Sequence, residues 1–207
     1  MPLRARGEPG SVPPVNNDFQ SKRVLVGVSG GIAAYKVCTL VSRLVQAGAD
    51  VTVAMTEGAT RFVTPLTFAS LSGKQVYSTP WEHIGVGGAQ DPQHISLARS
   101  LDAAIVAPCT MDCAARLATG RADDAVTLIL SAVDRAKTPV LLAPAMNAAM
   151  WSQPATQRNI ATLRADGFTL IGPSDGWQAC RTSGPGRMSE PEELLEALRE
   201  VIAAGQA

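Results

Sequence analysis

Short apolar runs that alternate with helix-like segments restrict the fold of this chain more than any other feature of its sequence. The runs are rich in Val, Ile, Leu and Ala and lie at 23–28, 51–55, 103–107, 140–143 and 168–171. Continuous apolar runs of this length are typical of strands that are buried on both faces of a sheet. The helical segments between them predict strand–helix–strand units, in which consecutive strands run parallel.

We therefore expect an α/β fold: a single-domain, Rossmann-like or flavodoxin-like parallel sheet with helices on both faces. The predicted helices cover residues 32–47, 65–71, 94–101, 110–118, 124–134 and 153–165. A final helix is predicted after a capping box of Ser189 and Glu192, with Pro191 in its first turn. The Gly- and Pro-rich segments 78–93 and 172–188 are expected to be loops.

Composition narrows the function classes. The chain has 207 residues, 46% of them hydrophobic, and a formal net charge of +0. A chain with no basic excess is not expected to bind nucleic acid, and one with no apolar run of roughly 18 residues is not expected to enter a membrane. The first 21 residues lack a signal-peptide core and are expected to be a disordered arm, followed by one domain over 22–207. Four Cys without a C-x-x-C pair and two His predict a cytoplasmic protein without a metal site.

The candidate site follows from what comes after each predicted strand, because ligands of parallel sheets bind at the carboxyl ends of the strands. Ser29-Gly30-Gly31 form a strand–turn–helix junction whose backbone N–H groups favour a phosphate, although an ordinary tight turn is equally compatible. The segment is neither G-x-G-x-x-G nor a Walker A loop, so a mononucleotide is favoured over a dinucleotide or ATP. Thr56 and Thr110 follow two other strands; Thr110 and Asp112 are also good helix caps.

Other polar residues stand in unusual surroundings. Asn147 is a lone amide in the apolar stretch APAMNAAMW after the strand that ends at Ala143. His94 begins a predicted helix, where a neutral imidazole could act as a base; a merely hydrogen-bonded His is the alternative for it and for His83. Cys180 lies in a long loop with Gly184, Pro185 and Gly186, which is typical of a lid.

Together SGGIAAYK, the His94-Ile-Ser-Leu motif, PAMNAAMW and ACRTSGPGRM resemble the homo-oligomeric, FMN-containing cysteine decarboxylases, from about Lys22 to the final helix. The resemblance implies FMN as cofactor, His94 as active-site base, Asn147 as the ligand of the substrate carboxylate and Cys180 as a proton donor. It implies that Met150 and Arg181 join Asn147 in binding substrate. The implied FMN contacts are Ser29, Gly30, Gly31, Thr56, Phe62, Thr110 and Met146.

Two substrates are compatible with this family. The chain leaves no room for a fused synthetase, and Arg181 stands where the coenzyme A motif has Gly. Both features favour oxidative decarboxylation of the C-terminal Cys of a precursor peptide, giving an aminovinyl-cysteine enethiol. The alternative is a phosphopantothenoylcysteine decarboxylase of coenzyme A biosynthesis, which the retained Cys180 favours. The resemblance further implies a homotrimer or a homododecamer, in which His94 and Asn147 face one flavin from different copies. A regulatory, non-catalytic member is disfavoured because no long acidic tail is present.

Overall fold

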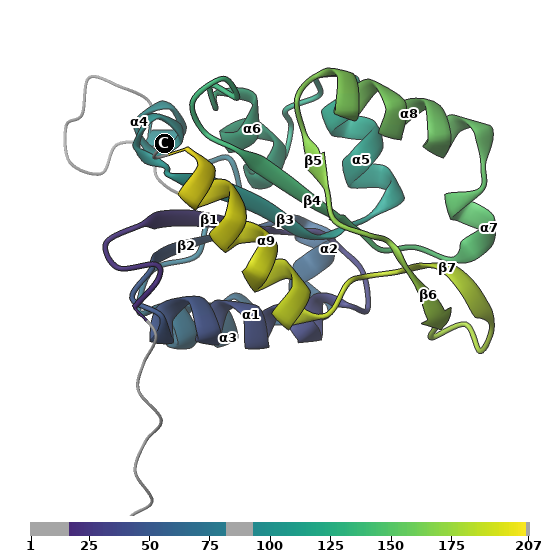
Figure 1. Ribbon diagram of the computed structural model, residues 1–207, viewed down its shortest axis with the longest axis horizontal. Helices are drawn as coiled ribbons and strands as arrows, with labels where there is room; N and C mark the ends of the chain where they lie inside the picture. Colours follow the sequence, from purple (N-terminus) through teal and green to yellow (C-terminus); the bar gives the residue numbers. More distant parts are fainter. Residues whose placement is uncertain (1–16, 82–92, 206–207) are drawn as a thin grey trace, which may run out of the picture.

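The computed structural model describes residues 17–81 and 93–205 and contains a five-stranded parallel sheet (Figure 1). Its strand order is β2-β1-β3-β4-β5, with consecutive neighbours parallel. The strands are β1 (Arg23–Val28), β2 (Asp50–Met55), β3 (Ala103–Cys109), β4 (Val140–Pro144) and β5 (Thr169–Leu170). The predicted α/β fold is therefore confirmed.

Helices cover both faces of the sheet, as the apolar runs predict. Their bounds are α1 (Ala34–Gln46), α2 (Glu57–Thr60), α3 (Pro65–Ser72), α4 (Gln93–Ser100), α5 (Met111–Ala118), α6 (Ala125–Ser131), α7 (Ala148–Trp151), α8 (Pro154–Ala165) and α9 (Pro191–Ala204). One core cluster joins α1, α3 and α9 to one face of the sheet, and the other joins α4, α5, α6 and α8 to the opposite face.

Strand β1 shows why its sequence is apolar throughout. Val24, Val26 and Val28 contribute to the first core cluster, while Leu25 contributes to the second. Successive side chains of a strand point to opposite faces, so a strand covered on both sides needs apolar residues at every position. Within residues 17–81 and 93–205, no helix is both long and apolar enough to span a bilayer.

Residues 17–21, the described part of the expected N-terminal arm, lie against the domain. Phe19 is fully buried in the first core cluster, and its backbone N–H donates to the carbonyl of Ala47 at 3.2 Å. A buried Phe side chain gains enough hydrophobic energy to hold a short polar segment against the domain. Residues 1–16, which make up the rest of the expected arm, lie outside the described residues, as does most of the predicted loop over 78–93, including His83.

The segment 172–188 was expected to be a loop, but it contains an antiparallel hairpin of β6 (Ser174–Trp177) and β7 (Ser183–Arg187). The hairpin projects beyond the carboxyl ends of the parallel strands, next to α7 (Figure 1). Its strands are rich in Gly and Ser and lack the alternating β-branched residues by which strands are identified in a sequence.

The predicted capping box at the last helix is displaced by one residue. Glu190 is the N-cap of α9, and its N–H donates to the carboxylate of Glu193 at 2.8 Å. Ser189 and Glu192, the expected pair, do not form the box. The reason is Pro191, which occupies the first helical position and makes the residue before it the cap.

Candidate active site

Two cavities adjoin at the carboxyl ends of the parallel strands. The first has a volume of about 740 Å³ and lies between the start of α1, the segment after β4 and the hairpin. The second has a volume of about 770 Å³ and lies between the segments that follow β1, β2 and β3. Gly30, Thr110 and Asp112 line both cavities, so one elongated ligand can extend from one into the other. The cavities therefore lie at the carboxyl ends of the strands, the edge of the sheet where the sequence predicts the site.

Two glycines shape the boundary between the cavities. A Cβ atom on Gly30 would lie 2.8 Å from the carbonyl carbon of Gly58, and one on Gly31 would lie 3.2 Å from Cγ2 of Thr110. A side chain at position 30 would therefore collide with the backbone of the turn that follows β2, and one at position 31 would press on the side chain of Thr110. Glycine at these positions lets the turns that follow β1, β2 and β3 lie close together beside the cavities.

The three hydroxyl residues of this edge differ in what they offer a ligand. Ser29 is 1% exposed; its Oγ donates to the carbonyl of Pro108 at 2.6 Å and accepts the backbone N–H of Thr110 at 3.0 Å. Its hydroxyl thus joins β1 to the end of β3. Thr56 and Thr110 are the N-caps of α2 and α5, so each hydroxyl oxygen accepts a backbone N–H. The hydroxyl of Thr56 keeps its own hydrogen, which it can donate into the second cavity. Oγ1 of Thr110 also lies 3.0 Å from Oγ of Ser29, and because the hydrogen of Ser29 goes to Pro108, Thr110 supplies the hydrogen between these two hydroxyls.

Asn147 is the N-cap of the short helix α7. Its Oδ1 accepts the backbone N–H of Ala149 at 2.8 Å, which fixes the orientation of the amide. Its Nδ2 then donates to Sγ of Cys180 at 2.9 Å. The amide of this otherwise apolar segment therefore presents hydrogen-bond donors to the first cavity, which is the orientation that a substrate carboxylate requires.

Cys180 lies in the turn of the hairpin and is exposed. Its Sγ is 3.0 Å from Oγ1 of Thr182 and 2.9 Å from Nδ2 of Asn147. These two hydrogen bonds, first that of Thr182 and then that of Asn147, lower the pKa of the Cys180 thiol from its ordinary value. Hydrogen bonds to a thiolate favour the charged form, so this thiol gives up its proton more readily than an isolated one.

Gln178 holds these groups together, although no pattern in the sequence predicts a role for it. Its side chain is 8% exposed, and Nε2 donates to the carbonyls of Gly184 at 3.2 Å and Pro185 at 2.9 Å. Its Oε1 accepts the N–H of Ala148 at 3.2 Å, one residue after Asn147. A buried Gln has no periodicity or motif by which it can be found in a single sequence, so the contact with Ala148 is visible only in three dimensions.

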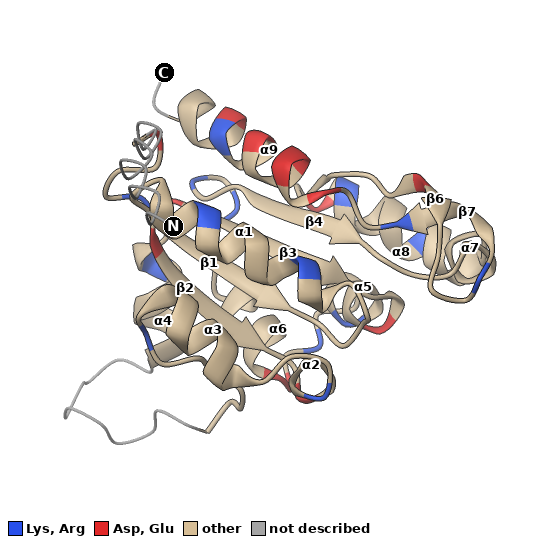
Figure 2. Cartoon of the chain, turned by 90° about the horizontal axis from the view of Figure 1, so that it is seen from below, with Lys and Arg blue, Asp and Glu red and all other residues tan. Residues whose placement is uncertain are grey.

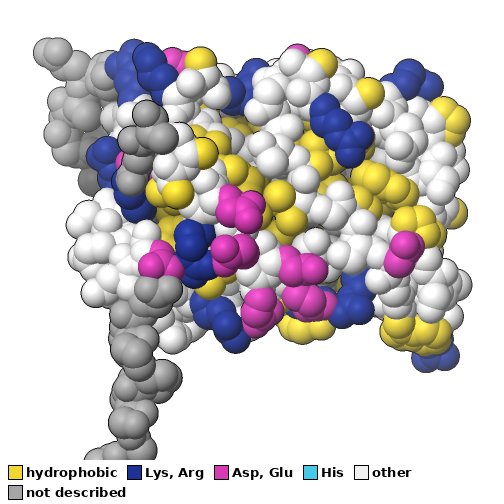
Figure 3. Space-filling view, in the orientation of Figure 1, with side chains coloured by type: hydrophobic (Ala, Val, Ile, Leu, Met, Phe, Trp, Pro, Cys, Tyr) yellow, Lys and Arg dark blue, Asp and Glu magenta, His cyan; other side chains and the backbone are white. Residues whose placement is uncertain are grey.

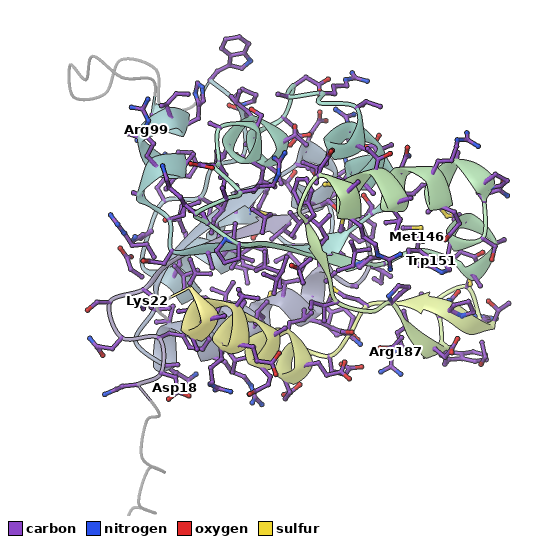
Figure 4. All side chains as sticks on the ribbon, turned by 45° about the horizontal axis from the view of Figure 1, so that its top comes forward. Asp18, Lys22, Arg99, Met146, Trp151 and Arg187 are labelled. Carbon is purple, nitrogen blue, oxygen red and sulfur yellow. The ribbon has the colours of Figure 1, made fainter. Side chains whose placement is uncertain are left out.

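A second contact attaches the hairpin to the segment after β4. The N–H of Met146 donates to the carbonyl of Gly186 at 2.9 Å. Gly186 has φ +125, and a Cβ atom there would overlap the carbonyl oxygen of Met146. This position therefore needs glycine both for its backbone conformation and for the close approach. Figure 4 shows Met146 and Trp151 on the side of this segment nearest the hairpin.

The predicted site residues divide into two groups. The first group lines one or both cavities and consists of Ser29, Gly30, Gly31, Thr56, Thr110, Met146, Asn147, Met150 and Cys180. The second group is absent from the described linings of both cavities and consists of Phe62, His94 and Arg181. Phe62 is 51% exposed, and His94 is the second residue of α4. Their predicted roles stay predictions.

A family and several relatives match this chain over most of its length. The pattern of the Flavoprotein family matches residues 14–203. The coenzyme A biosynthesis bifunctional protein CoaBC of Bacillus subtilis (strain 168) is 48% identical over 188 residues, which are 89% of this chain and 44% of that protein. CoaBC of Mycolicibacterium smegmatis is 44% identical over 186 residues, which are 90% of this chain and 43% of that protein. The chain thus spans less than half the length of these relatives.

Solved structures of similar fold include two kinds of decarboxylase. A cysteine-to-serine mutant of PPC decarboxylase complexed with pantothenoylaminoethenethiol has a TM-score of 0.75 and 30% identity, covering 87% of this chain and 98% of its own. The FMN-dependent cysteine decarboxylase SpaF has a TM-score of 0.74 and 29% identity, covering 91% of this chain and 99% of its own. Both kinds of neighbour resemble this chain to a similar degree.

Proposed function

Because the chain belongs to the Flavoprotein family, we propose that it is an FMN-dependent decarboxylase that acts on the carboxylate of a cysteine. The observation that carries this proposal is the contact between Asn147 and Cys180. A neutral amide donor and a thiol of lowered pKa meet at 2.9 Å in a cavity that adjoins a glycine-rich turn. This arrangement provides a carboxylate ligand and a proton donor side by side.

The two cavities fit FMN. The glycine-rich turn after β1 borders both cavities, and the hydroxyl of Thr56 can donate a hydrogen bond to phosphate or ribityl oxygens. Met146 borders the first cavity, where an apolar ring can be covered. Gly30 and Thr110, which line both cavities, would contact a cofactor that extends from one into the other.

Bound FMN would supply two-electron redox chemistry at the thiol-bearing carbon of the substrate. Asn147 binds the carboxylate through Nδ2 without the strong ion pair that would oppose its loss as CO2. Cys180 holds its proton at Sγ, next to that amide, and can transfer it to the substrate after CO2 has left. Thr182 supports this transfer, because its hydroxyl stabilises the thiolate that remains.

We further propose phosphopantothenoylcysteine as the substrate. The curated relatives at 44% and 48% identity are CoaBC proteins, and this supports the coenzyme A alternative over the precursor peptide that the sequence analysis favoured. The presence of Arg181 in place of Gly does not favour the peptide substrate. Its φ of +65 is a conformation that favours glycine, so Gly and Arg at this position can give the same turn.

His94 lies outside both cavities of a single chain, and we propose that it acts as the base at the site of a neighbouring copy in a homotrimer or homododecamer. Ile32, Tyr35 and Met150 border the first cavity and are 57%, 60% and 43% exposed, so apolar surface is available beside the site for a second copy. Size measurement in solution tests this assembly.

The test of the proposed function is CO2 release from phosphopantothenoylcysteine by the FMN-loaded protein. We expect release by the wild type and its loss in Asn147→Leu, with FMN still bound. Asn159→Leu is the matched control, because Asn159 lies on α8 and is absent from the described linings of both cavities. Normal CO2 release by Asn147→Leu would contradict the proposal. The proposal would also fail if the wild type released no CO2 from phosphopantothenoylcysteine or from a peptide that ends in cysteine.

A further inference from the structure

Two basic side chains line the same cavity as Asn147 and Cys180. They are Lys36 on α1 and Arg187 at the end of β7. Both contact one carboxylate: Lys36 Nζ donates to Glu190 Oε1 at 2.8 Å and to Oε2 at 3.0 Å, and Arg187 Nη2 donates to Oε1. Two positive charges therefore share one negative charge, and the cluster carries a net positive charge.

The other ionisable groups of this cavity do not cancel that charge. Asp112 also lines it, but its carboxylate accepts a hydrogen bond from Nε of Arg116 at 2.8 Å. Among the described residues that line the cavity, the remaining ionisable side chains are those of Tyr35 and Cys180. The hydrogen bond from Lys36, followed by the effect of Arg187, lowers the pKa of Glu190, so its carboxylate is ionised at neutral pH. The excess of one positive charge is thus maintained.

The position of Arg187 is built into the hairpin. A Cβ atom on Gly176 would lie 3.1 Å from both Cδ and Nη1 of Arg187, so the guanidinium passes over a residue without a side chain. A guanidinium has five N–H donors, and Glu190 accepts from Nη2. Figure 4 shows Arg187 where the hairpin approaches the start of α9.

A structural link between α1 and α9 explains Lys36 but does not require Arg187. Arg43 already joins α1 to α9, with its Nη2 2.8 Å from Oε1 of Glu192. In Figure 2, the basic residues of α1 and the acidic residues of α9 lie on neighbouring helices, and Figure 3 shows acidic side chains gathered along α9. Lys36 alone would complete the pairing of Glu190. The side chain of Lys36 is 15% exposed, whereas that of Arg187 is 41% exposed, so Arg187 keeps guanidinium donors accessible to a further anion.

We propose that Lys36 and Arg187 form an anion subsite that binds a phosphate monoester at the end of the substrate remote from its cysteine. This inference rests on the proposed function and adds to it the residues that select a phosphorylated substrate. Guanidinium and ammonium groups together suit a phosphate dianion, which accepts several charge-assisted hydrogen bonds. A peptide that ends in cysteine places its terminal carboxylate at Asn147 and needs no second anion site.

The experiment compares phosphopantothenoylcysteine with pantothenoylcysteine, which differ only in the phosphate. Values of kcat/KM are measured for both with the FMN-loaded wild type, Arg187→Gln, Lys36→Met and the control Arg43→Gln. We expect Arg187→Gln to lose roughly 10- to 100-fold for the phosphorylated substrate, mainly through KM, as one charge-assisted hydrogen bond is lost. Pantothenoylcysteine should change less than about twofold, and Arg187→Lys should recover part of the preference.

Binding of 4′-phosphopantothenate, followed by calorimetry, gives a readout that does not depend on turnover. It should be weakened in Arg187→Gln and Lys36→Met and unchanged in Arg43→Gln. Equal losses for both substrates, or an unchanged preference in both cavity variants, would refute the subsite. If only a peptide were decarboxylated, the proposed function would fail, while unchanged binding of 4′-phosphopantothenate in the variants would separately refute the subsite.

Discussion

Replacing Gln178 by Met removes the hydrogen bonds that attach the hairpin to α7 while keeping a side chain of similar length. The change deprives the carbonyls of Gly184 and Pro185 and the N–H of Ala148 of their partner. Gln178 itself is 8% exposed, whereas Gly184 and Ala148 are partly buried and Pro185 is exposed, so each lost bond should cost the net value of a typical hydrogen bond. The hairpin would be held less firmly against the segment that carries Asn147.

The expected loss follows from the number of bonds. A typical protein hydrogen bond contributes about 1 kcal/mol net, and an unpaired buried group costs about 1–3 kcal/mol. With three backbone groups affected, the free energy of unfolding should fall by about 3 kcal/mol. For a chain of this size, that corresponds to a decrease in Tm of about 6–12 °C.

Thermal unfolding of wild type and variant measures this difference, with Gln157→Met as the control. Gln157 makes one exposed hydrogen bond, from Nε2 to the carbonyl of Trp151 at 2.7 Å, so its loss should cost about 0.5 kcal/mol or less. The two variants should therefore be clearly separated in Tm. Equal Tm values for the two variants would refute the reasoning that Gln178 is the main attachment of the hairpin.

Three further predictions concern the site and its turns. Thr182→Val removes the hydrogen bond that lowers the pKa of the Cys180 thiol, so the midpoint of its alkylation by iodoacetamide should move to higher pH; an unchanged midpoint would contradict this cause. Gly30→Ala places a Cβ 2.8 Å from the carbonyl carbon of Gly58, so FMN affinity, read from flavin fluorescence, should fall at least about tenfold. Arg181→Gly relieves a positive φ and should stabilise the fold by about 0.5–1 kcal/mol in denaturant titration; destabilisation would argue that the Arg181 side chain makes a compensating contact.

The parallel sheet was predictable because strands that are buried on both faces consist of apolar residues. A strand such as β3, buried at all seven positions, reads as an uninterrupted apolar run. The hairpin was not predictable, because its glycines serve close contacts such as that of Gly186 with Met146 rather than a hydrophobic pattern. The burial of Phe19 was not predictable for a related reason. A lone aromatic residue in a polar segment shows no periodicity from which burial can be inferred.

Most of the predicted site residues line the cavities, but their arrangement could not be predicted. Asn147 and Cys180 were both identified, but their contact joins residues 33 positions apart and depends on the hairpin. Ser29 was expected to contact FMN, but its hydroxyl donates to the carbonyl of Pro108 inside the protein. A serine that binds a ligand and a serine that bonds to the protein's own backbone look the same in a sequence. Only the burial of the side chain in the structure distinguishes the two roles.

The most direct test of the proposed substrate is a competition between phosphopantothenoylcysteine and a short peptide ending in cysteine, offered together to the FMN-loaded protein. Mass spectrometry follows the loss of CO2 from each. We expect phosphopantothenoylcysteine to lose CO2 alone while the peptide remains intact. Loss of CO2 and two hydrogens from the peptide, with phosphopantothenoylcysteine unchanged, would contradict the assignment.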